Sequence, residues 1–344
     1  PFDQVDRGSG LHLRAMGLLH RRSAALLATL AAAPLLALTA ARPAGGAGDE
    51  ESGPRAAKAL RIATIGASVT AGYGNARELR TDADVPLSTF LRTLTSERRP
   101  VEVTGRGDRW CFADAPKVGA RQVDAALATS PTLVVAADFL FWYAYGRSTR
   151  RDPRREAGLE EGLRQLDRIG CPLVVGDLPD ISSALDGKGP FGGPLVTRDL
   201  FPTDEQRTRM NERIRAWAER RGGVEIVPLS EITTRMRTGQ TLVVRGNSWT
   251  VTDLGDALQD DRLHPTVRGS TWVAMECIAA ATRFEGVEAD DFDWDEEGAA
   301  RRLEAATEPA RRARAEKEQQ RRERRERREK ARDQRRDQTP DGGR

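Results

Sequence analysis

The sequence predicts an α/β protein whose parallel five-stranded sheet is covered by helices on both faces. Short apolar, β-branched runs alternate along the chain with segments in which apolar residues recur every three or four positions, as on one buried helix face. The apolar runs are nearly continuous, which is typical of parallel strands buried on both sides. Five such strands separated by helices define the fold class.

The expected elements follow one another in a regular order. The strands are expected at 59–66, 101–107, 132–142, 171–180 and 224–230. The helices are expected at 84–97, 120–130, 154–170, 203–223 and 266–284. Gly170 closes one helix, and the next opens on a Thr203–Asp204 cap and closes on two glycines. The Gly- and Pro-rich segment 191–202 is expected to be a surface loop.

The N-terminal part of the chain is interpreted as a targeting segment. Met16 opens a pattern of basic residues, an apolar Ala/Leu stretch and small residues over 16–41, which is typical of a secretory signal peptide. Residues 1–15 are then an upstream extension outside the mature protein, and 42–56 form a Pro/Gly-rich spacer. The pattern predicts export to the periplasm or the cell exterior. An uncleaved N-terminal membrane anchor is the alternative.

The C-terminal tail, 296–344, is expected to lie outside the folded domain, which the sequence places at 57–295. Residues 301–344 hold seventeen Lys or Arg and ten Asp or Glu, a net charge of +7, so the rest of the chain carries −4 of the total +3. The basic pI therefore does not predict nucleic-acid binding by the main domain. The tail lacks an apolar stripe, which predicts a disordered segment or a single solvated helix, with contact to an anionic surface as its alternative role.

Export would permit disulfides, and the chain has three cysteines. Cys111 in a loop-like stretch and Cys171 just before a strand form the favoured pair. Cys277 lies in an apolar helical pattern and is expected to be a buried thiol.

The candidate site residues lie just past the ends of the expected strands. In parallel sheets the active crevice lies beyond the carboxyl ends of the strands. That rule selects Ser68, Gly105, Asp138 and Asp177.

Histidine is scarce in this chain, and the scarcity limits the chemistry. Of three histidines, only His264 lies outside the N-terminal targeting segment and the extension before it. Asp261 precedes it by three residues and can orient the imidazole, as the acid does in a Ser-His-Asp relay. A serine needs such a base, because its hydroxyl is a poor nucleophile alone, and Ser68 is the candidate. The alternative is an incidental histidine in an Asp-rich surface loop.

Three sequence blocks resemble those of the SGNH (GDSL-like) hydrolase superfamily. They are "IGASVTAGYG" around Ser68, "VEVTGRGD" around Gly105, and "DRLHP" with Asp261 and His264. The resemblance implies a flavodoxin-like three-layer α/β/α sandwich and a serine esterase without cofactor or metal. Ser68 would be the nucleophile, His264 the base and Asp261 its partner. The Ser68 and Gly105 N–H groups would form the oxyanion hole, with Gly107 as an alternative to Gly105.

The third block of that family is divergent here. It normally reads Gly-x-Asn-Asp, with the asparagine donating to the oxyanion. In "VVAADFLFWYAYG", Asp138 stands at the position of that asparagine and Phe139 at that of the aspartate. An ionised carboxylate cannot donate a hydrogen bond. Asp138 is therefore held protonated, serves another role, or leaves the domain impaired.

An aromatic run follows the third expected strand. Phe139, Phe141 and Trp142, with two tyrosines beside them, can form an apolar wall for an acyl group or a stacking face for a sugar. Core packing is the alternative. Asp177 can orient a substrate hydroxyl or cap a turn.

Together these observations predict an exported serine ester hydrolase that works through an acyl-enzyme. Its substrate would be a small-molecule, lipid or polysaccharide ester. The first alternative is a catalytically impaired module of the same fold whose basic tail attaches to an anionic surface. The second is acyl transfer to an acceptor other than water.

Overall fold

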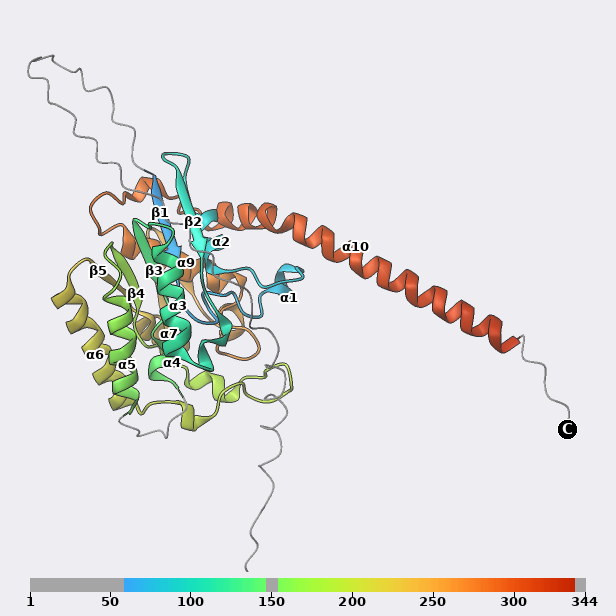
Figure 1. The fold of residues 1–344 in the computed structure, drawn as a ribbon, viewed down its shortest axis with the longest axis horizontal. Helices are drawn as coiled ribbons and strands as arrows, with labels where there is room; N and C mark the ends of the chain where they lie inside the picture. The colour runs from blue at the N-terminus through green and yellow to red at the C-terminus, as the bar shows by residue number, and fades with distance from the viewer. Residues whose placement is uncertain (1–58, 147–153, 338–344) are drawn as a thin grey trace, which may run out of the picture. The chain divides into compact units, whose positions relative to one another are not determined.

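The computed structural model describes residues 59–146 and 154–337, and its centre is one parallel sheet (Figure 1). The strands are β1 (Leu60–Thr64), β2 (Val101–Gly105), β3 (Leu133–Ala136), β4 (Leu173–Gly176) and β5 (Val224–Val227). They lie in the order β2-β1-β3-β4-β5, and each neighbouring pair is parallel. This is the flavodoxin-like strand order, so the predicted fold class is confirmed.

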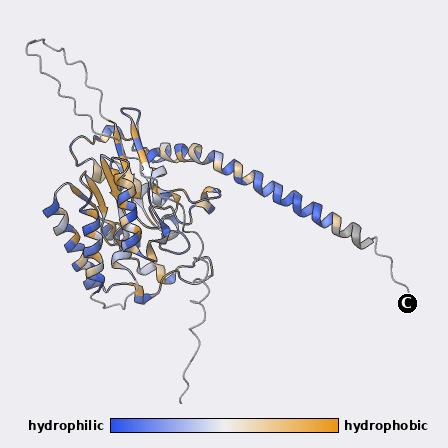
Figure 2. Ribbon diagram, viewed as in Figure 1, coloured by the Kyte–Doolittle hydropathy of each residue, from blue (hydrophilic) through white to orange (hydrophobic). Residues whose placement is uncertain are grey.

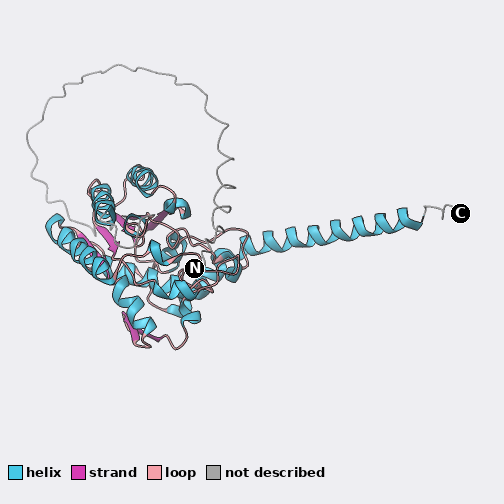
Figure 3. Cartoon of the chain, turned by 90° about the horizontal axis from the view of Figure 1, so that it is seen from below, coloured by secondary structure: helices cyan, strands magenta, loops and turns pink. Residues whose placement is uncertain are grey.

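Helices cover both faces of the sheet (Figure 3). They are α1 (Ala76–Leu79), α2 (Leu87–Thr93), α3 (Ala115–Leu127), α4 (Phe141–Ala144), α5 (Arg154–Leu166), α6 (Asp204–Arg221), α7 (Leu229–Arg237), α8 (Leu254–Ala257), α9 (Val267–Ala281) and α10 (Glu296–Asp337). Successive strand residues point to opposite faces, so Ile62 packs with α2 and α9 while Ala63 packs with α3, α5 and α6. The inner strands β1, β3 and β4 are strongly hydrophobic, as Figure 2 shows, because both of their faces are buried.

One segment between β5 and α9 has structure that the sequence pattern did not predict. It contains α7, a two-stranded antiparallel hairpin and α8. The hairpin pairs β6 (Thr241–Val244) with β7 (Asn247–Thr250), and Arg245 and Gly246 at its turn both have positive φ. Only two residues separate its short strands, and only one side of it is buried, so it lacks the long apolar run that marks the central strands.

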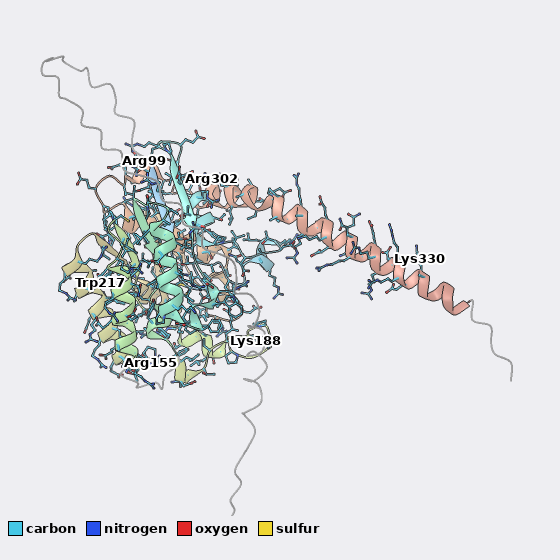
Figure 4. All side chains as sticks on the ribbon, in the orientation of Figure 1. Arg99, Arg155, Lys188, Trp217, Arg302 and Lys330 are labelled. Atoms are coloured by element: carbon cyan, nitrogen blue, oxygen red, sulfur yellow. The ribbon has the colours of Figure 1, made fainter. Side chains whose placement is uncertain are left out.

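The tail is not separate from the folded domain at its beginning. Ala299, Leu303 and Thr307 recur every four residues on α10 and are buried, and the helix packs against α2 and α9. The expectation that no face of 296–344 meets the core is therefore wrong. The buried stripe has too few small and apolar residues to stand out in the highly charged composition of this segment. Arg302 on the same turns also donates to a backbone carbonyl of α2 (Figure 4).

Farther along α10 the helix is solvated. The side chains described from 318 to 331, Lys330 among them, are all exposed. Opposite charges four residues apart, such as Arg325 and Glu329, form ion pairs on its surface. The single-helix form expected for the tail describes this part.

The cysteines do not pair. Cys111, Cys171 and Cys277 are free, so the favoured Cys111–Cys171 disulfide is wrong. Cys111 lies beyond the carboxyl end of β2, whereas Cys171 precedes the amino end of β4. Strands rise about 3.3 Å per residue, which puts the two at opposite edges of the sheet and beyond the roughly 7 Å Cα separation that a disulfide allows. Cys277 is buried in α9, as predicted.

The targeting segment predicted at 16–41 lies outside the described residues. Among the residues that the structure does describe, no helix has the length and apolar character to span a membrane.

Candidate active site

The candidate nucleophile sits on a turn that a single carboxylate holds in place. Ser68 follows β1 and is half-buried, so its hydroxyl is reachable. On either side of it, the backbone N–H groups of Ala67 and Val69 donate to Asp138, at 2.9 and 2.7 Å. Thr70 adds a backbone N–H at 3.3 Å and its hydroxyl at 2.5 Å. Asp138 follows β3, the direct neighbour of β1, and this adjacency allows the contact.

Glycine at position 66 is required by this arrangement. A Cβ there would lie 2.1 Å from a carboxylate oxygen of Asp138 and 2.3 Å from the Thr70 hydroxyl. The Gly66 carbonyl also accepts a hydrogen bond from the Gln122 side chain at 2.7 Å. The turn is thus fixed from both sides.

The Asp138 side chain is placed as an acceptor. Burial raises its pKa above the ordinary value, and hydrogen bonds, first that of Thr70, oppose the shift. Three of its four partners are backbone N–H groups, which can only donate. Of the three alternatives left open for Asp138, its contacts fit a role other than oxyanion donor.

His264 lies between Ser68 and Asp261 at hydrogen-bonding distance from both. His264 Nε2 is 2.8 Å from Ser68 Oγ, and His264 Nδ1 is 2.7 Å from Asp261 Oδ2. The carboxylate at Nδ1 fixes the proton there, which leaves Nε2 as the acceptor facing the serine hydroxyl. Burial acts to raise the pKa of Asp261, but the hydrogen bond and charge of His264 outweigh it, and the net pKa is lowered.

A tight loop before α9 sets the position of the histidine. Arg262 adopts a left-handed conformation, with φ of 53°. The reversal brings Asp261 Oδ1 within reach of the backbone N–H groups of Leu263 and His264, at 2.9 and 3.0 Å. Tyr73 packs on the imidazole with ring centroids 4.5 Å apart. Tyr73 lies in the block around Ser68, but nothing in the sequence indicates its contact with the histidine.

The backbone N–H groups of Ser68 and Gly107 have no hydrogen-bond partner within 59–146 and 154–337. Gly107 lies against the Thr70–Ala71 peptide, where a Cβ would meet backbone atoms at 2.8 Å. Gly105 instead ends β2 opposite Thr64, and the ladder continues past it through the Arg106 N–H. In a parallel ladder, alternate N–H groups point away from the neighbouring strand, so that of Gly105 is directed away from β1.

An apolar cavity opens beside the serine and histidine. It is lined by Ser68, His264 and Phe141 at one part, and then by side chains of α7, β6, β7, α8 and α9. These side chains are Leu229, Ile232, Met236, Leu242, Trp249, Leu254, Trp272 and Val273. No sequence pattern marked them as site residues, because they come from the segment between β5 and α9 and from one stripe of α9.

The aromatic run serves mainly the core. Phe139, Tyr143 and Tyr145 are buried, and the Tyr145 ring stacks on Phe141 at 4.4 Å. Phe141 reaches the cavity, whereas half-buried Trp142 packs with Phe112 at 6.0 Å, away from it.

Asp177 caps α7. It accepts from the backbone N–H and hydroxyl of Ser230, at 2.7 and 2.6 Å, and pairs with Arg215 at 2.8 Å. Burial raises the pKa of Asp177, and the contacts with Ser230 and Arg215 act in the opposite direction. The turn-capping alternative fits this placement.

Within the described part of the chain, no three His, Cys, Asp or Glu side chains gather in a way that could hold a metal ion.

Fold and site define a three-layer α/β protein with a Ser-His-Asp constellation at the carboxyl edge of its sheet. No family model matches the sequence, and no curated protein matches it. Solved structures do share similarity. An acetylxylan esterase, Axe2 from Geobacillus stearothermophilus, matches at TM-score 0.41 and 14% identity over 67% of this chain and 97% of its own.

Two other solved structures are similar at the same level. TesA matches at TM-score 0.36 and 15% identity, over 63% of this chain and 95% of its own. A GDSL-like lipase from Bacteroides thetaiotaomicron matches at TM-score 0.34 and 14% identity, over 65% and 86%. Similarity of this size extends no activity or substrate to this chain.

Replacing Asp138 by asparagine is expected to weaken the protein. An amide has one acceptor oxygen, so its NH₂ group would face backbone N–H donors of the turn, and each unpaired buried donor costs about 1–3 kcal/mol. Asp138→Asn should lower the free energy of unfolding by that amount in urea titrations, and ester hydrolysis should fall with it. Exposed Asp124→Asn is the control. A stable Asp138→Asn protein with higher activity would instead mean that position 138 lacks an oxyanion donor.

The stability of the protein should depend on pH because of Glu276 in the cavity wall. Burial raises its pKa from 4.5 to about 7, so the folded state binds a proton that the unfolded state has released between these values. Stability is therefore lost as pH rises through this window, by up to about 3 kcal/mol. In calorimetry, Glu276→Gln should have a higher melting temperature than the unmodified protein at pH 8. At pH 5 this difference in melting temperature should be smaller. Exposed Glu219→Gln should show no such difference, and a pH-independent effect of Glu276→Gln would refute the assignment.

Proposed function

We propose that this protein is a serine ester hydrolase with Ser68 as nucleophile. The observation that carries the proposal is the pair of short contacts through His264, 2.8 Å to Ser68 Oγ and 2.7 Å to Asp261 Oδ2. A reachable hydroxyl, a neutral nitrogen facing it and a buried carboxylate behind that nitrogen are what nucleophilic catalysis by serine needs.

The acylation step follows from this geometry. Ser68 Oγ attacks the ester carbonyl carbon as its proton passes to His264 Nε2, and a tetrahedral oxyanion forms. Collapse of this intermediate breaks the ester C–O bond, and the imidazolium gives its proton to the departing alkoxide. The acyl group is then bonded to Ser68, and the alcohol leaves. Asp261 stays ionised and stabilises the imidazolium.

The deacylation step reverses these roles with water. His264 takes a proton from a water molecule, whose oxygen attacks the acyl carbon. His264 then returns that proton to Ser68 Oγ, and the carboxylic acid departs. Because no group in this cycle requires a cofactor, the chain's own residues supply all of the proton transfers.

The oxyanion is stabilised by backbone groups in this proposal. Among the residues that the structure describes, the Ser68 N–H has no partner, whereas the neighbouring N–H groups are held by Asp138. Gly107 supplies the second N–H in preference to Gly105, since it lies against the nucleophile turn and its N–H has no partner within the described residues. A preorganised donor of this kind is worth about 10²–10³ in rate.

Export and the tail complete the proposal. The signal-peptide pattern over 16–41 supports export of the hydrolase, with 57–295 as its catalytic domain extended by the first turns of α10. The solvated part of α10 is basic and free of core contacts, which supports a role in contacting an anionic surface.

Removing the nucleophile or the base should abolish hydrolysis. In purified protein assayed with p-nitrophenyl esters, Ser68→Ala and His264→Ala are expected to lower kcat by about 10⁴-fold or more, with Asp261→Asn close behind. Ser96→Ala, which changes a half-buried serine outside the site, is the matched control. Retained activity in Ser68→Ala would reject the proposal. A folded but wholly inactive protein would favour the impaired module, and product that depends on an added alcohol would reveal acyl transfer.

A further inference from the structure

The cavity beside Ser68 is positioned to receive one end of a substrate. It has a volume of about 130 Å³ and begins at the Ser68–His264 pair. From there it follows the inner stripe of α9, whose residues Gly269, Trp272, Val273 and Glu276 all line it. Gly269 and Glu276 are seven residues apart, which corresponds to about 10 Å along the helix. The hairpin and α7 form the opposite wall.

The lining favours an apolar group. Leu242 and Trp249 of the hairpin, with Trp272 of α9, contribute large apolar surfaces, and the two indole rings pack at 5.5 Å. Several polar side chains in the wall are engaged within the protein, whereas Trp272 Nε1 has no hydrogen-bond partner among the described residues. Thr233 donates to the Leu229 carbonyl at 2.8 Å, and Arg237 pairs with Asp180 at 2.8 Å. A polar ligand group entering here would lose water and meet mostly apolar side chains, with Trp272 Nε1 and the Glu276 carboxyl as exceptions.

The volume sets the size of that group. An apolar protein cavity of about 150 Å³ holds benzene, a molecule of six carbon atoms. The 130 Å³ cavity therefore has room for a chain of similar carbon content.

We propose that the cavity between α9, α7 and the β6–β7 hairpin binds the acyl group of the ester substrate and limits it to about six carbon atoms. The proposal rests on the hydrolase function, because the carbonyl carbon must lie at Ser68 for the acyl chain to enter. Val273 is a specificity residue in it, since it lines the cavity one turn beyond Gly269 and does not touch the reacting atoms.

The chain-length profile tests the proposal in the full chain. With p-nitrophenyl esters from acetyl to dodecanoyl, kcat/KM should rise up to about fourfold per CH₂ group toward hexanoyl and then fall. Val273→Phe fills the cavity and should lower the hexanoyl-to-acetyl ratio of kcat/KM at least tenfold. Val273→Ala enlarges it and should move the optimum to longer chains. Val243→Phe, the same substitution at an exposed hairpin position, should leave the profile unchanged.

A binding measurement separates this proposal from the hydrolase function. Hexanoate should bind Ser68→Ala protein more tightly than acetate or dodecanoate in calorimetry, and Val273→Phe in that background should abolish the preference. If hexanoate binds but no ester is hydrolysed, the proposed hydrolase function is contradicted, and the proposal that the cavity binds an acyl group is retained. Hydrolysis with a flat profile that neither Val273 variant alters would overturn the cavity proposal and leave the hydrolase. Absence of both would overturn both.

Discussion

The hydrogen bonds that Asp138 accepts from the turn after β1 are the interaction on which the rest of the site depends. A polypeptide that leaves a strand and reverses within a few residues exposes several backbone N–H groups at once, and burying them unpaired is costly. Asp138 pairs three of them and the Thr70 hydroxyl. In the described part of the chain the Ser68 N–H has no partner between its bonded neighbours, and the Ser68 hydroxyl meets His264. The same carboxylate explains why position 66 is glycine.

The fold was predictable from the sequence to the extent that hydrophobic pattern decides it. Each of the five central strands lies within its predicted range, and the hydrophobic signal is strongest in β3 and β4, whose residues are all buried. The hairpin of β6 and β7 buries one side only, and its signal is weak. On α10, Ala299, Leu303 and Thr307 form a stripe too narrow to stand out among charged residues.

The site also has parts that the sequence predicted and parts that it did not. Ser68, Asp261 and His264 come together because strand ends and a short-range Asp-x-x-His spacing are local features that a sequence displays. The acceptor role of Asp138 was not predictable, because it depends on which N–H groups a neighbouring turn presents. The cavity was beyond prediction for a further reason. Its walls come from elements whose mutual packing is set by tertiary contacts, with Trp249 against Trp272 as one example.

Catalysis and selectivity are therefore assigned to different parts of the chain. The carboxyl ends of β1 and β3, with the loop before α9, arrange the reacting groups. The segment from α7 to α8 forms part of the wall of the apolar cavity in which we place the acyl group. A change in the second part can alter which ester is accepted while the first part keeps its geometry.

The most direct test of this account is covalent labelling of the purified protein with a fluorophosphonate, followed by peptide mass spectrometry. An activated serine attacks phosphorus and retains the phosphonyl group, whereas an ordinary hydroxyl does not react. We expect one label per chain, on Ser68, and at least a hundredfold slower labelling in His264→Ala. Labelling at another serine, or an equal rate in His264→Ala, would contradict the account.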